Sequence, residues 1–340
     1  MTFRRTRGAH LYFRSVTRWC MPFVHNLKQF TCLRKLKFEA FSYSERGLDV
    51  LDQLESLEVG AYPGFDAKSL ADCCQTMKKL RYLNFGQLIP KISKNNFEIL
   101  VTNCQQLERL AFGVELLDST VPYELVCQLP KLRHLQVWHG GSLRESFIEG
   151  LINKLGSPLE SLILKGHVLK EAQVQHLCNI STVKELDIFC DTLPFADLLK
   201  LKNLIYFHIS SPMTEDQLLH LPYALPRVKV LNSQFCPELY VPFLTSVRNW
   251  VNEQRKQRGR IKIRFGFRAK PVISYANLFV KIIEGRLGPI LINKELKIQM
   301  LPKRLQIKRV YHLHMYMHVE DACEDINVTY TTQKNATPRL

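Results

Sequence analysis

Apolar residues recur along this chain in one short phrase that repeats nine times between residues 33 and 231. Each full copy starts with an apolar residue, continues through two further positions, and ends in an apolar, variable, apolar alternation. The copies are Leu33–Phe38, Leu54–Val59, Leu80–Phe85, Leu107–Phe112, Leu132–Val137, Leu159–Leu164, Val183–Ile188, Leu204–Ile209 and a weaker one at Val228–Leu231. Because successive side chains of a strand point to opposite faces, the alternation predicts one short strand in each copy.

The spacing of these phrases predicts the fold class. The first residues of successive copies lie 21 to 27 positions apart, which is the period of leucine-rich repeats. Between the strands, residues 93–104, 145–156 and 214–225 have apolar positions at helical spacing, and the last segment opens with the capping-box pattern Thr214-Glu-Asp-Gln217. Such units bury their apolar faces only by stacking. The sequence therefore predicts an α/β leucine-rich-repeat solenoid, with a curved parallel sheet on the concave face and helices on the convex face.

The domain organisation follows from where the phrase occurs. We expect the repeat array at residues 27–266, with about nine repeats, a longer amphipathic helix at 237–259 and a closing strand at 262–266. Residues 1–26 form a basic N-terminal segment, interpreted as a remnant or a cap. Residues 267–340 are basic, lack the phrase, and are expected to form an irregular or disordered tail outside the array.

The net charge of +16 is concentrated at the two ends of the chain. Residues 1–30 contain 6 Lys and Arg and no acid, residues 31–250 contain 23 against 24, and residues 251–340 contain 18 against 7. Basic ends on a neutral body do not predict a groove for a phosphate backbone, so no specific nucleic-acid partner is expected. No apolar run long enough to cross a membrane occurs, and the ten cysteines do not frame small loops. We therefore expect a cytoplasmic protein, with the nucleus as an alternative location, and no membrane partner.

The nine phrases, their variable period and the run Cys104-Gln-Gln-Leu-Glu-Arg-Leu110 resemble the leucine-rich-repeat arrays of F-box proteins, the substrate receptors of cullin-based ubiquitin ligases. This resemblance implies substrate recognition in ubiquitin-dependent protein catabolism. It does not extend to an F-box, because no Leu-Pro-x-Glu phrase precedes Leu33. Binding of the ligase adaptor is therefore not expected. Alternatives are a scaffold or adaptor without a ubiquitin link, or a regulator of a small GTPase.

The candidate binding residues are those that alternate with the buried strand positions and so point to the concave face, where repeat arrays usually bind. They are Tyr82, Arg109, His134, Gln136, Trp138, Ile163, Asp187, Phe189, Tyr206 and His208. Large aromatic side chains are favoured interface anchors, although each of these could instead pack sideways onto a neighbouring repeat. A protein is the expected partner.

No motif predicts an enzyme. The chain lacks a phosphate-binding loop, a nucleophile elbow and a glycine-rich dinucleotide turn, so no catalytic residue and no cofactor is predicted. His312, His314, His318 and Cys323 could supply metal ligands, but no paired Cys-x-x-Cys accompanies them. No metal site is therefore predicted.

Overall fold

In the computed structural model, the chain forms one open sheet of 12 strands with short helices between them. The structure describes residues 8–13, 29–41, 48–62, 67–86, 92–115, 117–211, 213–228, 230–235, 261–269 and 276–284, together with a few single positions. The strands that run in parallel are β1 (Gly8–Phe13), β2 (Lys35–Phe41), β3 (Ser56–Tyr62), β4 (Tyr82–Asn84), β5 (Arg109–Gly113), β6 (His134–His139), β7 (Ser161–Gly166), β8 (Glu185–Ile188), β9 (Tyr206–Ile209) and β10 (Val230–Phe235). They pair in sequence order.

The register of the sheet follows the repeated phrase. Leu36 stands opposite Leu57, and the fourth residue of every later phrase continues the same row through Leu83, Leu110, Leu135, Leu162, Leu186 and Phe207 to Leu231. From Leu36 to Phe207 each side chain of this row is at most 3% exposed. The nine predicted strands are confirmed, and the fold is a leucine-rich-repeat solenoid.

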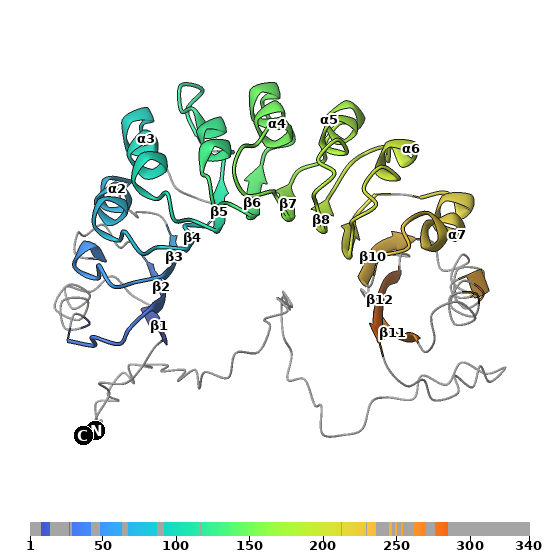
Figure 1. The fold of residues 1–340 in the computed structure, drawn as a ribbon, viewed down its shortest axis with the longest axis horizontal. Helices are drawn as coiled ribbons and strands as arrows, with labels where there is room; N and C mark the ends of the chain where they lie inside the picture. The colour runs from blue at the N-terminus through green and yellow to red at the C-terminus, as the bar shows by residue number, and fades with distance from the viewer. Residues whose placement is uncertain are drawn as a thin grey trace, which may run out of the picture.

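Helices cover the outer side of the curved sheet, whereas the strands line its inner side (Figure 1). The helical elements are η2 (Leu48–Val50), α2 (Ala67–Thr76), α3 (Lys94–Asn103), η3 (Tyr123–Gln128), α4 (Glu145–Ile152), α5 (Glu171–Leu177), α6 (Phe195–Leu198) and α7 (Glu215–Ala224). The three helices predicted from apolar spacing are α3, α4 and α7. Ser93 caps α3, and Thr214 and Gln217 form the predicted capping box of α7.

One apolar core runs through the described array from Leu27 to Val228. Its largest fully buried side chains include Phe97 and Phe112, whose ring centroids lie 5.9 Å apart. Cys73, Cys74, Cys104, Cys127 and Cys178 are free thiols buried in this core, as expected. Burial raises the pKa of both Cys127 and Cys178 to about 12, so these thiols stay protonated and behave as small apolar side chains.

Two strands of the sheet lie outside the predicted array. β1 belongs to the N-terminal basic segment, and Gly8 stands opposite Lys35. β12 (Ala276–Glu284) belongs to the segment expected to be an irregular tail, and it pairs antiparallel with β10. β11 (Ile261–Ala269) contains the predicted closing strand, but it pairs with β12 rather than with β10. The open edge of β10 has unpaired backbone groups, which explains why an apolar strand without the repeated phrase adds to it.

Some sequence predictions fall outside the described residues. These are most of the helix expected at 237–259 and the cluster of His312, His314, His318 and Cys323. Within the part of the chain that the structure describes, no helix combines the length and apolar character needed to cross a membrane.

Candidate functional site

The concave face consists of the strand residues that alternate with the buried leucine row. In β4 and β9 this alternation is regular, because half-buried Tyr82 and Asn84 flank buried Leu83, and half-buried Tyr206 and His208 flank buried Phe207. Parallel pairing then places equivalent positions of neighbouring strands side by side. The predicted candidate residues therefore lie on one face of the sheet, and the strands line the inner side of the arc in Figure 1.

Four large side chains from consecutive repeats lie on this face in three different rows of the strand register, and we call the set the apolar centre: Trp138, Ile163, Phe189 and Tyr206. Trp138 (β6), Ile163 (β7) and Tyr206 (β9) are half-buried, and Phe189, which directly follows β8, is 38% exposed. The Phe189 carbonyl accepts the Leu169 N–H at 2.8 Å, which holds this residue next to the preceding repeat. Partly solvent-exposed aromatic side chains are typical of binding anchors.

The apolar centre also presents hydrogen-bond donors. Among the described residues, neither the Trp138 indole N–H nor the Tyr206 hydroxyl has a hydrogen-bond partner. Burial raises the pKa of Tyr206 to about 12, and the carboxylates of Asp187 and Glu185 add to this effect. The hydroxyl therefore stays protonated near neutral pH, and both rings can donate to a bound backbone or side chain.

Beside the apolar centre lies a polar cluster of Lys165, Asp187, His208 and Ser210. The Nδ1 atom of His208 is 3.0 Å from the Oδ1 atom of Asp187, and its Nε2 atom is 3.4 Å from the Ser210 hydroxyl oxygen. Burial lowers the pKa of Lys165, whereas the Asp187 carboxylate opposes this. Asp187 therefore interacts with a cation or imidazole on each side, and the cluster largely satisfies its own charges.

Serine, histidine and aspartate in this order are also the residue set of serine hydrolases. Such an enzyme needs N–H donors aimed at the oxyanion that forms beside the serine. The Ser210 N–H instead donates to the Ile188 carbonyl at 3.2 Å, as part of the strand pairing. We interpret the cluster as a device that orients His208 on the concave face.

Two exposed charges mark the ends of the central part of the face. Arg109 is the first residue of β5, and Glu185 is the first residue of β8. Neither forms an ion pair with another described residue. His134 lies between them on β6, and burial lowers its pKa, the nearby Arg109 cation lowers it further, and Glu185 opposes this. The first row of strand residues thus carries a positive and a negative end, with His134 and Ser161 between them.

The structure corrects the prediction at one residue and adds another. Gln136 was expected as a contact residue, but only 7% of it is exposed, and its register neighbour Ala111 is buried as well. The concave surface is covered at this point, which strand alternation alone does not reveal. Glu185 was not predicted, although its position at the start of a strand, equivalent to Arg109 and His134, is visible in the phrases.

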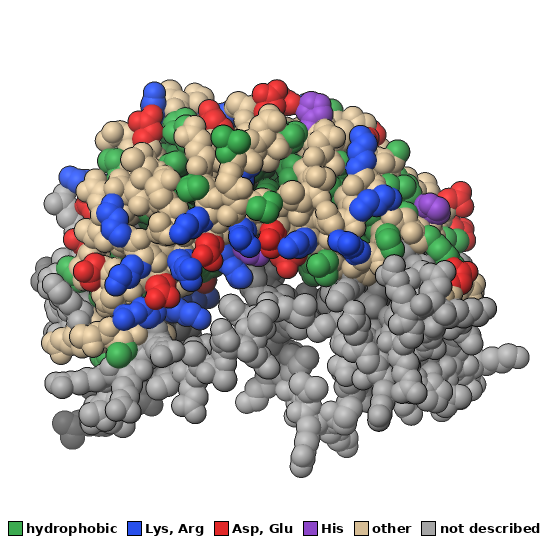
Figure 2. Space-filling model, viewed as in Figure 1, with side chains coloured by type: hydrophobic (Ala, Val, Ile, Leu, Met, Phe, Trp, Pro, Cys, Tyr) green, Lys and Arg blue, Asp and Glu red, His purple; other side chains and the backbone are tan. Residues whose placement is uncertain are grey.

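A second feature, which we call the charge ladder, runs along one flank of the array. It consists of the second residue of the first seven phrases: Arg34, Glu55, Arg81, Glu108, Arg133, Glu160 and Lys184. Their charges alternate in sign without exception. Arg81 is 3.1 Å from Glu108, and Glu160 lies 3.4 Å from Arg133 and 3.2 Å from Lys184. On the surface drawn in Figure 2, basic and acidic side chains are intermixed along the length of the array.

The backbone holds the ladder residues at a regular spacing. Each of their carbonyls accepts two N–H groups from the next repeat; for example, the Arg81 carbonyl accepts those of Glu108 and Arg109 at 2.8 and 2.9 Å. The same pattern continues to the Lys184 carbonyl, which accepts the N–H groups of Ile205 and Tyr206. Ile205 occupies the next ladder position and is 37% exposed, so the alternation of charge ends there.

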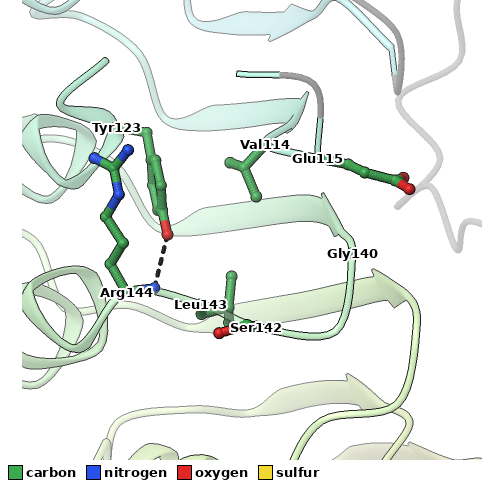
Figure 3. A pocket seen from close by; sticks show the side chains of 7 residues that line it. All are labelled: Val114, Glu115, Tyr123, Gly140, Ser142, Leu143 and Arg144. Atoms are coloured by element: carbon green, nitrogen blue, oxygen red, sulfur yellow. Dashed lines mark hydrogen bonds between the residues drawn. The ribbon is translucent and has the colours of Figure 1, made fainter. Parts of the chain in front are cut away.

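The pocket in Figure 3 lies at the C-terminal ends of β5 and β6 and has a volume of about 240 Å³. The Tyr123 hydroxyl accepts the Arg144 N–H at 2.7 Å, and the Arg144 guanidinium lies 4.6 Å from the Tyr123 ring centroid. That guanidinium also donates to the carbonyls of Val121 and Ser119. Its polar groups are therefore engaged in structure, and the volume is below the range of ~300 to 1,000 Å³ typical of small-molecule sites.

No group of three or more potential metal ligands occurs within the described residues. No protein-family model matches the sequence. No curated protein sequence matches it either.

Among solved structures, the chain is similar to the leucine-rich-repeat ectodomain of the plant membrane receptor kinase GASSHO1/SCHENGEN3 from Arabidopsis thaliana, determined in complex with CASPARIAN STRIP INTEGRITY FACTOR 2. The identity is 16% and the TM-score is 0.29. The match covers 57% of this chain and 26% of that one, so this chain spans about a quarter of the length of that structure. We draw no functional conclusion from this likeness.

Proposed function

We propose that this chain is a protein-binding module without catalytic activity and that its concave face is the binding site. The observation that carries the proposal is the apolar centre, which leaves large side chains from four consecutive repeats partly exposed, two of them with ring donors that have no partner among the described residues. Exposed apolar surface is unfavourable in water, and a protein surface offers both apolar contacts and backbone acceptors.

We further propose that the bound protein is a substrate of a cullin-based ubiquitin ligase. Support for this finer statement is the resemblance of the repeated phrases to those of F-box receptors. The alternatives are a scaffold without a ubiquitin link and a regulator of a small GTPase. Affinity capture from cell extract with and without proteasome inhibition separates them, because a ligase substrate accumulates under inhibition, whereas a scaffold partner does not.

The test of the binding site is the combined substitution Trp138→Ala, Phe189→Ala and Tyr206→Ala. Anchors of this kind commonly contribute ~2 kcal/mol or more each, so the triple variant is expected to lose its partner. Capture followed by quantitative mass spectrometry measures the loss, and circular dichroism checks that the array remains folded.

A matched control removes exposed apolar side chains outside the concave face. Leu155 follows α4 and is 83% exposed, and Tyr223 in α7 is 40% exposed. The double variant Leu155→Ala and Tyr223→Ala is expected to capture the same proteins as the unmodified chain. Undiminished capture by the triple variant contradicts a concave binding site.

A further inference from the structure

We propose that the concave face binds an extended protein segment in which an acidic and a basic residue, about four positions apart, flank a bulky apolar residue. This inference rests on the proposed function and deepens it, because it states the chemistry of the partner. It follows from the charges that the face leaves free, from their separation, and from what lies between them.

On the central strands β5 to β8, the exposed charges without an ion pair are Arg109 and Glu185. Two other concave carboxylates are paired: Glu58 lies 3.0 Å from Lys37, and Asp187 is paired with His208. Lys35 is also exposed, but it lies on β2, outside this central part. Arg109 and Glu185 are exposed and make no ion pair among the described residues. An acidic side chain on Arg109 and a basic side chain on Glu185 would complete the electrostatic complementarity of the site.

The separation of the two charges sets the spacing in the bound segment. Arg109 stands opposite His134, His134 opposite Ser161, and Ser161 opposite Glu185, so three strand steps separate the charges. Steps of ~4.8 Å give roughly 14 Å. An extended chain advances ~3.4 Å per residue and covers this distance in about four residues.

The straight path between the two charges passes over His134 and Ser161, which carry no opposite charge for a bound side chain. Ser161 is buried, and half-buried Ile163 lies two residues further along β7 on the same face, about 7 Å from the path. A bulky apolar residue at the centre of the segment would cover Ser161 and reach Ile163. A charged residue there would lose water without gaining an opposite charge.

The experiment selects binders from a displayed library of random segments of about twelve residues, using the full-length chain as bait. The expected consensus has one acidic and one basic residue about four apart, around an apolar residue. Arg109→Glu leaves two acidic ends and is expected to select segments with two basic residues. Glu185→Lys leaves two basic ends and is expected to select segments with two acidic residues. Each swap should change the affinity of the original segments by about fivefold or more at low salt.

Matched controls reverse charges on the helical side of the array. They are Lys170→Glu, at the residue before α5, and Glu149→Lys, within α4; both residues are exposed. They change the net charge as the two test variants do, so they are expected to select the same consensus as the unmodified chain. If the control variants changed the selected segments as much as the test variants do, long-range electrostatic attraction would explain the selection, and the proposal would be overturned.

The outcomes distinguish this inference from the proposed function. If the selected segments lose binding to the triple alanine variant but ignore both charge reversals, the concave site stands and the charge pattern is overturned. If they bind the triple variant undiminished, the proposed site itself fails. Three other results would each overturn the extended-segment proposal. The first is that the library yields no enriched segment, and the second is a charge spacing of about nine or ten residues, as in a helix. The third is dimerisation of the chain that Arg109→Glu abolishes.

Discussion

At the scale of single residues, His139 shows how the end of a strand can bury a titratable group. It closes β6 with no exposed surface, and its Nδ1 atom accepts the Gly141 N–H at 3.1 Å. The proton of the neutral ring is therefore on Nε2, which has no hydrogen-bond partner among the described residues. Burial lowers the pKa of His139 to about 4, and the nearby His167 adds to this effect.

This lowered pKa predicts that the folded chain becomes less stable as the pH decreases. The unfolded chain takes up the proton near pH 6.5 and the folded chain only near pH 4. Stability from the neutral ring is therefore complete above pH 6.5 and declines by about 1.4 kcal/mol per pH unit as the pH falls towards 4. His139→Asn keeps an acceptor for Gly141 and does not titrate. Urea unfolding at pH 7 and pH 5 should show a smaller loss in the variant, and equal losses would contradict this assignment.

The residue scale also shows what a single sequence predicts and what it does not. The leucines of the repeated phrase could be assigned to the core, because their two-residue alternation places them on one face of each strand. The burial of Gln136 and His139 could not, since it depends on side chains of the adjacent repeats. The candidate residues could accordingly be assigned to one strand face, and their role in binding stays a prediction. Glu185 was missed, because it has significance only beside Arg109 three strands away.

At the scale of elements, the helices differ in how their first turns are stabilised. At α7 the Thr214 hydroxyl accepts the Gln217 N–H at 3.3 Å, and the Gln217 side chain accepts the Thr214 N–H at 3.0 Å. By contrast, the N-cap residues of α4 and α5 are Arg144 and Lys170, whose side chains form no capping hydrogen bond. The capping box was predictable because both of its residues are local in sequence. β12 was not, because an open sheet edge accepts many apolar segments.

The cap of α7 gives a measurable prediction. Thr214→Ala removes one acceptor and is expected to destabilise the chain by about 1 kcal/mol. Thr214→Ser keeps the hydroxyl and serves as the matched control, with a change of a few tenths of that value. Thermal unfolding of both variants is the measurement, and an equal effect of the two substitutions would assign the loss to packing of the Thr214 methyl group.

At the scale of the whole molecule, stability depends on stacking, since each repeat buries its apolar face against its neighbours. Leu162 on β7 is fully buried, with Leu135 and Leu186 beside it in the row. The sequence also places Leu36 near an end of the array, but β1 gives it a neighbour on both sides. The predicted difference between the middle and this end is therefore smaller than the phrases alone indicate.

Leu162→Ala is expected to cost about 2 to 5 kcal/mol because it opens a cavity in the middle of the stack. Leu155→Ala, which removes a side chain that is 83% exposed, is its matched control and should leave the unfolding midpoint unchanged. Denaturant titration followed by circular dichroism measures both. A loss at Leu162 no larger than at Leu155 would be incompatible with a continuous core.

The charge ladder has a consequence for how nine chemically similar strands find their correct neighbours. Backbone pairing and leucine packing are nearly the same for any two repeats, so they discriminate poorly between adjacent strands and strands two places apart. The alternating charges make this distinction. Neighbours such as Arg81 and Glu108 attract each other. Skipping one repeat would instead place Arg81 beside Arg133, or Glu108 beside Glu160. Each pair of strands misassembled in this way would place two like charges side by side. The ladder thus favours the correct order of the repeats through one charged position per repeat, and it acts only when two strands pair.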